Sequence, residues 1–188
     1  MSQRINTIGL LHDQIRLYTK NPTLCIDATA GNGKDTLFLA DLVGENGNVI
    51  SMDIQQDAID HSRVLLEENG LYERVKFVKD GHESMDRYAK EGSVDCITFN
   101  LGYLPGGNHA ISTTAETTIT AIDKGLRLLK SGGIISLAIY QGGDTGFTEK
   151  NAVLTYLKTL DCKKYTVLVT DFFNRPNYPP LSVFVLKE

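Results

Sequence analysis

Residues 24–36 decide the fold, and they read LCIDATAGNGKDT. The apolar run at 24–28 is typical of a short buried strand, and the Gly31-Asn32-Gly33 sequence that follows it marks a tight turn. From residue 35 to residue 43 the apolar side chains recur at helical spacing, and Gly44 closes the segment. A strand that passes through a glycine turn into a helix is the opening of a βαβ unit.

The rest of the chain repeats this alternation of strands and helices. The short connection at 171–181 holds three prolines and leaves no room for a crossover helix, so the last strand must run antiparallel. We therefore expect one α/β, Rossmann-like domain over residues 1–188, with a seven-stranded, mostly parallel sheet, an antiparallel last strand and an N-terminal helix. The expected strands are 24–28, 48–53, 75–79, 94–100, 134–140, 163–170 and 182–186, and the expected helices are 5–18, 35–43, 55–68, 82–90, 116–129 and 148–160.

The composition is that of an ordinary globular protein of 188 residues. No stretch of about 18 apolar residues and no targeting segment is present, so we expect a cytoplasmic protein that spans no membrane. Three widely spaced cysteines predict neither a disulfide framework nor a zinc site. The net charge of −4 counts against broad, sequence-blind binding of nucleic acid, but it leaves room for a local basic patch.

Three classes of ligand bind at glycine turns of this kind, and the residues of this turn favour one of them. A P-loop requires glycine where Ala28 stands and Ser or Thr where Asp35 stands, and the charge of Asp35 repels phosphate. A dinucleotide site requires glycine at the position of Thr36. S-adenosyl-L-methionine (SAM) carries no phosphate but an ammonium, a sulfonium and a ribose diol, and carboxylates favour all three. The turn therefore predicts SAM as the cofactor, in the fold that is usual for class I SAM-dependent methyltransferases.

Carboxylates end the first three strands, where ligands of such sheets bind. Asp27 is expected to hold the ammonium of SAM directly or through water, Asp53 the ribose hydroxyls, and Asp80 the adenine amino group. The alternative interpretation is that each aspartate only caps a helix or forms a turn. The residues expected to bind the cofactor are Asp27, Thr29, Gly31, Asn32, Gly33, Asp35, Thr36, Asp53, Ile54, Asp80, Gly81, His82, Asn100 and Leu101.

The fourth strand ends in a partial acceptor motif. Amino-group methyltransferases often carry Asp/Asn-Pro-Pro-aromatic here, and in this chain Asn100 and Tyr103 keep the two ends while Leu101-Gly102 replaces the prolines. We expect Asn100 to accept a hydrogen bond from the target amine and Tyr103 to pack on the target base, both as catalytic residues. The alternative is an asparagine turn with a packed tyrosine. Cys96 lies inside the strand, which argues against a cysteine nucleophile, and no metal-ligand spacing is present.

Longer runs of the sequence resemble one small bacterial family, described as rRNA-methylase-like. The resemblance rests on residues 27–40 and 99–107, on Glu116-Thr117-Thr118 and on Asn177-Tyr178-Pro179-Pro180. It implies methylation of the 5-aminomethyl group of 2-thiouridine at the tRNA wobble position, which gives mnm5s2U. The chain departs from the family at Tyr140-Gln141-Gly142, where relatives often have Tyr-His-Gly. If that histidine removes a proton in relatives, this chain does without it or uses His82 or His109.

The connection before the last strand is the expected contact with RNA, because it follows a parallel strand and so lies at the same sheet edge as the aspartates. The alternative is that its rings fill the core. The expected substrate-binding residues are Tyr103, Glu116, Arg175, Asn177 and Tyr178. As partner we expect the anticodon stem-loop of tRNA, with a homodimer left open and with neither a membrane nor a metal. Methylation of a nitrogen in rRNA or in a small molecule, and a SAM-binding module without catalysis, remain as rival interpretations.

Overall fold

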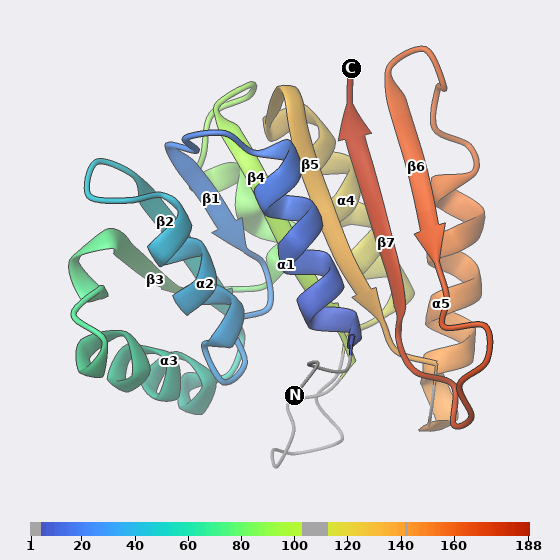
Figure 1. Cartoon of the computed structure of the whole chain (residues 1–188), viewed down its shortest axis with the longest axis horizontal. Helices are drawn as coiled ribbons and strands as arrows, with labels where there is room; N and C mark the ends of the chain where they lie inside the picture. Colours follow the sequence, from blue (N-terminus) through green and yellow to red (C-terminus); the bar gives the residue numbers. More distant parts are fainter. Residues whose placement is uncertain (1–4, 103–112, 142) are drawn as a thin grey trace.

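The computed structural model describes residues 5–102, 113–141 and 143–188, and the side chains of residues 143–146 are left aside (Figure 1). It confirms the predicted fold class: seven strands form one sheet, and helices cover both of its faces. The strands are β1 (Leu24–Asp27), β2 (Asn48–Asp53), β3 (Val75–Lys79), β4 (Val94–Leu101), β5 (Leu129–Ile139), β6 (Tyr165–Thr170) and β7 (Leu181–Lys187). The α-helices are α1 (Thr7–Tyr18), α2 (Lys34–Leu42), α3 (Gln56–Glu68), α4 (Ala115–Leu128) and α5 (Gly143–Leu157), with 3₁₀ turns η1 (Tyr72–Arg74) and η2 (His82–Arg87).

The strand order β3-β2-β1-β4-β5-β7-β6 places the first strand in the middle of the sheet. Neighbouring strands are parallel except around β7, which runs antiparallel to both β5 and β6, as the short final connection requires. The helices α1, α2 and α3 pack on one face, and η2, α4 and α5 pack on the other (Figure 1). The order reverses between β1 and β4, so their carboxyl ends flank the crevice where open α/β sheets bind ligands.

Three predicted elements differ from the structure by three residues or more. The predicted helix at 82–90 is the 3₁₀ turn η2, which ends at Arg87. Strand β5 begins at Leu129 and not at 134, because Leu129 already pairs with Val94 before the register shifts and Ile134 pairs with Cys96. Helix α5 begins at Gly143 and not at 148, and it ends at Leu157 and not at 160. Packing overrides the low helix propensity of glycine there, since Val153 and Leu157 of the same helix are buried in the core.

Two glycines allow the chain to turn sharply between β1 and α2. Gly31 and Gly33 have φ angles of 51° and 78°, in the left-handed region that glycine tolerates best. A Cβ atom on Gly33 would lie 2.8 Å from the Cα of Ser62 in α3, so the turn also fits closely against that helix. The positions of both glycines are therefore fixed by backbone conformation, and that of Gly33 also by packing.

A fully buried carboxylate lies beneath this turn. Asp27 accepts hydrogen bonds from the hydroxyl of Thr36 at 2.6 Å and from the backbone N–H of Thr29 at 3.2 Å. Burial, followed by the nearby charge of Asp35, raises the pKa of Asp27 to about 7. Asp27 therefore joins the end of β1 to the first turn of α2 from inside the protein.

Among the described residues, no helix is both long enough and apolar enough to cross a bilayer.

The variant Gly33→Ala should lose roughly 3 kcal/mol of unfolding free energy, because it adds a backbone clash to the strain of a left-handed conformation. Gly70→Ala is the matched control, since its φ of +67° is similar but its Cβ meets nothing within 4 Å, and it should lose only about 1–2 kcal/mol. Urea unfolding monitored by circular dichroism measures both. Equal losses in the two variants would show that α3 does not constrain the turn.

The variant Asp27→Asn should change how stability depends on pH. The pKa of Asp27 is higher in the folded protein than its ordinary value of 3.8, so the wild type loses stability relative to the variant as pH rises from about 4 to about 7. The loss amounts to about 1.4 kcal/mol for each pH unit between the two pKa values. Urea unfolding at pH 5 and pH 8 tests this, with Asp41→Asn on the exposed side of α2 as the control. A difference between wild type and Asp27→Asn that stays constant with pH would contradict the burial of a titrating carboxyl.

Candidate active site at the carboxyl ends of β1 and β4

Hydrogen bonds close the crevice between β1 and β4 at its base. The backbone N–H of Ala28 donates to the carbonyl of Thr98 at 2.9 Å, and the backbone N–H of Asn100 donates to the hydroxyl of Thr29 at 2.7 Å. Thr29 therefore fixes the end of β4 against the glycine turn. The cofactor residues and the acceptor residue predicted from sequence are thus brought together at one point of the sheet edge.

Asp53 connects the end of β2 to the same turn. One carboxylate oxygen accepts from the backbone N–H of Gly31 at 3.0 Å, and the other accepts from the N–H of Gln55 at 2.9 Å. A carboxylate has about four acceptor positions, so two remain for a ligand. The side chain of Ile54, next along the chain, is 53% exposed and offers an apolar surface beside Asp53. This pair suits a ribose with an adjoining flat ring.

Asp80 lies at the end of β3 with partners of its own. It accepts from the hydroxyl of Tyr88 and from the backbone N–H of Gly81, both at 2.8 Å, and Arg87 approaches it at 3.6 Å. The pKa of Asp80 is lowered from its ordinary value, chiefly by the hydrogen bond from Tyr88. The hydrogen bond from Gly81 and the positive charge of Arg87 lower it further. Asp80 is therefore a charged acceptor at the edge of the crevice.

His82 follows Asp80 and is almost fully buried. Burial lowers its pKa, and its ring lies edge-on to Phe99 with centroids 5.8 Å apart. No described residue bonds its Nε2 atom, which is buried. A neutral imidazole with a free nitrogen inside the site is a group that a ligand can meet. His109, the other histidine considered as a base, lies outside the described residues.

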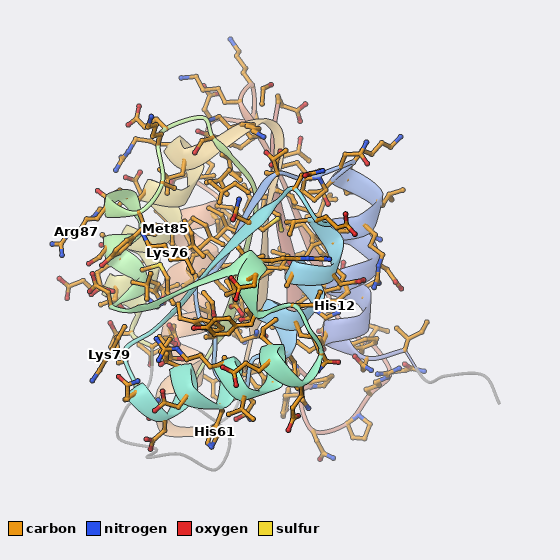
Figure 2. The ribbon with its side chains drawn as sticks, turned by 90° about the vertical axis from the view of Figure 1, so that its left-hand side faces the viewer. His12, His61, Lys76, Lys79, Met85 and Arg87 are labelled. Atoms are coloured by element: carbon orange, nitrogen blue, oxygen red, sulfur yellow. The ribbon has the colours of Figure 1, made fainter. Side chains whose placement is uncertain are left out.

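Asn100 forms a network that the sequence did not predict. Its Nδ2 donates to Asp35 at the start of α2, and the other oxygen of Asp35 lies 2.6 Å from Nε2 of His12. His12, which is labelled in Figure 2, belongs to α1. It reaches Asp35 and stacks on Phe38 with a centroid distance of 3.7 Å. His12 was missed because the apolar period of α1 marks a helix but not the helix beside which it packs.

The carbonyl oxygen of Asn100 is buried, and no described residue donates a hydrogen bond to it. A buried acceptor without a partner costs about 1–3 kcal/mol, so its presence at a sheet edge points to a ligand that supplies the donor. Tyr103, the other predicted catalytic residue, lies outside the described residues.

Gln141 takes a structural position at the end of β5. Its side chain donates to the carbonyl of Pro179 at 2.7 Å and accepts from Lys150 at 3.2 Å, and it is 7% exposed. At the position where the family resemblance implies a histidine, this chain therefore has a side chain that holds the connection between β6 and β7. A glutamine amide cannot remove a proton.

Glu149 is a buried polar group that, like His12, was not predicted from the sequence. It accepts from the hydroxyls of Thr113 at 2.9 Å and Thr118 at 2.8 Å, and Thr113 in turn receives the backbone N–H of Gly102 at 2.9 Å. The carboxylate thereby ties α5 to the end of β4 and to the start of α4. Glu116, the acidic residue predicted to bind substrate, is exposed in the first turn of α4.

The connection between β6 and β7 presents exposed aromatic rings. Phe173 is fully exposed and Tyr178 is 71% exposed, whereas Phe172 is half-buried, so the alternative in which all three rings fill the core is wrong. Tyr178 lies edge-on to Phe147 of α5, with ring centroids 6.2 Å apart. The guanidinium carbon of Arg175 lies 3.8 Å from the ring centroid of Phe172, so Arg175 stacks on that ring. Asn177 is exposed and has a φ of 67°. The predicted substrate residues of this segment therefore lie on the surface.

The remaining predicted cofactor residues lie along the same strand ends. Asn32 is exposed in the turn, whereas Leu101 is buried and belongs to the core below the site. Within the described part of the chain, no three His, Cys, Asp or Glu side chains are placed to hold a metal ion. The thiol of Cys96 is fully buried, and burial raises its pKa well above the ordinary value, so it stays protonated.

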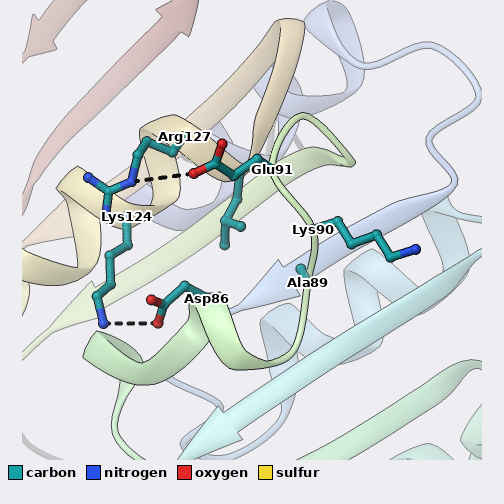
Figure 3. Close-up of a pocket in the computed structure, with 7 residues that line it drawn as sticks. Asp86, Ala89, Lys90, Glu91, Lys124 and Arg127 are labelled. Atoms are coloured by element: carbon teal, nitrogen blue, oxygen red, sulfur yellow. Dashed lines mark hydrogen bonds and ion pairs between the residues drawn. The ribbon is translucent and has the colours of Figure 1, made fainter.

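A pocket of about 400 Å³ lies at the opposite end of the sheet, where β4 begins and α4 ends (Figure 3). Two of its three basic side chains are already paired: Lys124 with Asp86 at 2.9 Å, and Arg127 with Glu91 at 3.9 Å. None of the predicted site residues lines it. We therefore place the candidate site at the carboxyl ends of the strands and not in this pocket.

Similar proteins carry related names. A solved structure from Clostridium thermocellum, described as a "putative rRNA-methylase", is 49% identical, covers 99% of this chain and all of its own, and superposes with a TM-score of 0.94. A "putative methyltransferase" from Streptococcus mutans, solved in complex with SAH, is 35% identical over 99% of this chain and all of its own, with a TM-score of 0.89.

A curated relative, the chloroplastic tRNA (mnm5s2U34)-methyltransferase of Arabidopsis thaliana, is 40% identical over 87% of this chain. The chain spans 62% of the length of that relative. The family model described as "Putative rRNA methylase" matches residues 49–186. This match covers β2 to β7 and both Asp53 and Asn100, and the chain therefore belongs to that family.

Proposed function

We propose that this protein is a SAM-dependent N-methyltransferase that methylates the 5-aminomethyl group of the tRNA wobble (thio)uridine, giving mnm5s2U. The observation that carries the proposal is the carbonyl oxygen of Asn100, which is buried at the topological switch point of the sheet and receives no hydrogen bond from the described residues. An amine is the donor that this acceptor lacks. An RNA acceptor is supported by a relative named for tRNA that matches 87% of this chain and by relatives named for rRNA that match about half of it, whereas a relative named for ubiquinone/menaquinone biosynthesis matches 41% of the chain.

The cofactor assignment rests on the arrangement of the three strand-end carboxylates. Asp53, with Ile54 beside it, would hold the ribose and adjoin the adenine, and Asp80 would accept from the adenine amino group. Asp27 is fully buried, so its role is to hold the turn whose backbone meets the methionine end of SAM. SAH, which the S. mutans structure binds, is what SAM becomes after it gives up its methyl group.

The chemistry asks little of the protein beyond placement. SAM is a strong electrophile, so an amine held in line with its methyl group reacts once its lone pair is free. Alkyl amines resemble lysine, whose ordinary pKa is about 10.4, and a water-poor site beside a sulfonium favours the neutral form. The carbonyl oxygen of Asn100 would accept a hydrogen bond from an N–H of that amine, and this would aim the lone pair of the amine at the methyl group. No side chain is thereby required as a strong base.

The surface beside the site favours RNA over a small molecule. A small-molecule enzyme needs no exposed stacking groups around its pocket, whereas here the exposed rings of Phe173 and Tyr178 stand with the half-buried Arg175 on a single connection at the same sheet edge. Unpaired bases of RNA loops are recognised by stacking on such groups. Stacking is worth about 1–3 kcal/mol per base, which offsets the unfavourable net charge of −4. rRNA remains the second candidate, because the family is named for it.

The location and assembly of the protein stay predictions. A cytoplasmic location accords with the absence of a membrane-spanning helix among the described residues, while the name of the plant relative places that protein in the chloroplast. The anticodon stem-loop is the expected partner, and a homodimer remains open.

Asp53→Ala should weaken SAM binding about 10- to 100-fold, because a charged hydrogen bond to the ribose is worth roughly 1.5–3 kcal/mol. Isothermal calorimetry measures the affinity. Asp57→Ala, which removes the same charge from the exposed first turn of α3, is the control and should bind SAM as the wild type does. Unchanged affinity in Asp53→Ala would remove Asp53 from the cofactor site.

Asn100→Ala should lower kcat about a hundredfold while SAM affinity stays within a few fold, because its side chain positions the acceptor and not the cofactor. Single-turnover methylation of aminomethylated tRNA with labelled SAM provides the rate. Asn69→Ala, at the exposed end of α3, is the control. Full activity of Asn100→Ala would eliminate the amine-acceptor role on which the proposal rests.

Arg175→Ala and Tyr178→Ala should each raise the KM for tRNA roughly tenfold, without a change in SAM affinity or thermal midpoint, because stacking on bases is lost. Tyr72→Ala, an aromatic change beside the amino end of β3, should leave the KM for tRNA unchanged. An unchanged KM for tRNA in both Arg175→Ala and Tyr178→Ala would favour a small-molecule substrate over RNA.

A further inference from the structure

We propose that Asp35 and His12 are positioning residues that set the orientation of the Asn100 carboxamide, so that its oxygen and not its NH₂ group meets the acceptor amine. The inference deepens the proposed function and rests on it. It concerns a choice that a lone asparagine cannot make, since its oxygen and nitrogen ends have nearly the same shape.

The choice matters because the two orientations have opposite chemistry. With the oxygen toward the amine, Asn100 accepts an N–H and leaves the lone pair of the amine free for the methyl group. With the NH₂ group toward the amine, it donates to that lone pair and blocks the reaction. The nitrogen of a planar amide has no lone pair available for accepting, so the flipped state cannot substitute for the native one.

Asp35 decides between the two orientations electrostatically. A carboxylate only accepts hydrogen bonds, and it receives the NH₂ group of Asn100. A flipped amide would place its carbonyl oxygen against the negative oxygens of Asp35, whose side chain is only 10% exposed. In such a poorly solvated place that repulsion is weakly screened. The NH₂ group is therefore held on Asp35, and the unpartnered oxygen is directed away from it.

His12 fixes Asp35 in turn. Because a carboxylate cannot donate, Nε2 of His12 carries the hydrogen in the 2.6 Å contact with the second oxygen of Asp35. The imidazole is itself held by its parallel stacking on Phe38, with an interplanar angle of 6°. Three elements thus contribute to one chain of hydrogen bonds, which runs from α1 through α2 to the end of β4. The hydroxyl of Thr29 contacts the backbone of Asn100 and not its side chain, and Asn100 pairs with Ala138 of β5 in the sheet.

Exchanging the two residues tests the proposal. Asp35→Asn alone frees the Asn100 amide to flip, and Asn100→Asp alone places two carboxylates in contact, so each should lower kcat about tenfold or more. In the double variant D35N/N100D, the amide at position 35 accepts from His12 and donates to the carboxylate at position 100, whose remaining oxygen again faces the amine. Its kcat should recover to within a few fold of the wild type. Asp41→Asn, which removes a charge from the exposed side of α2, should have no effect.

The role of His12 has its own matched pair of variants. His12→Phe keeps a ring on Phe38 but removes the donor, and it should lower kcat several fold with SAM affinity unchanged. His12→Gln keeps an N–H donor and should retain more activity than His12→Phe. If the two variants have equal kcat at equal thermal midpoints, His12 does not act through Asp35.

A second readout does not depend on activity. The side-chain NH₂ signals of Asn100, identified by their loss in Asn100→Asp, should shift in the ¹H–¹⁵N spectrum of Asp35→Asn and stay in place in Asp41→Asn. Failure of the double variant to regain activity, with wild-type methylation intact and all midpoints similar, overturns the positioning role alone. A wild type that does not methylate aminomethylated tRNA overturns the proposed function instead, and the NMR shifts then still decide whether Asp35 orients the amide.

Discussion

The architecture of the site depends on one buried carboxylate. Asp27 sits below the turn after β1 and holds it through Thr29 and Thr36, with no exposed surface of its own. Such a group is costly to bury charged, and the raised pKa expresses that cost. In return the backbone of the turn is fixed where β1 and β4 diverge. The cofactor residues and Asn100 are placed relative to each other through this turn, by Asp53 on one side and Thr29 on the other.

The acceptor side is built by a different principle. Its groups come from three separate elements and meet through hydrogen bonds between side chains, from His12 to Asp35 to Asn100. Asp35 therefore belongs to both halves of the site: it opens the helix behind the glycine turn, and it holds the amide that faces the acceptor. The sequence placed Asp35 beside the glycine turn, but it did not predict that the side chain contacts His12 and Asn100. Through this arrangement α1, a helix far from the motif in sequence, contacts the candidate site.

Features that follow from local chain geometry could be predicted from the sequence. Asp53, Asp80 and Asn100 were predicted to lie together because parallel strands end at one edge of the sheet. The antiparallel direction of β7 was predicted because the connection before it is too short for a crossover helix. Features that follow from packing could not. The early start of α5 at Gly143, the register shift before Ile134 and the contact of His12 with Asp35 depend on neighbours that no local pattern names. The exposure of Phe173 and Tyr178 likewise could not be predicted from the sequence, since aromatic rings are common both in a core and on an RNA-binding surface.

The most direct test of the central claim follows the methyl group itself. The protein is incubated with SAM carrying a ¹³C-labelled methyl group and with two tRNA samples, one unmodified and one bearing 5-aminomethyl-2-thiouridine, and the nucleosides are then separated by mass. We predict a single labelled methyl on the aminomethyl nitrogen of the modified nucleoside and none in the unmodified tRNA. Label on a ring atom, label in both samples alike, or no label in either sample would contradict the claim.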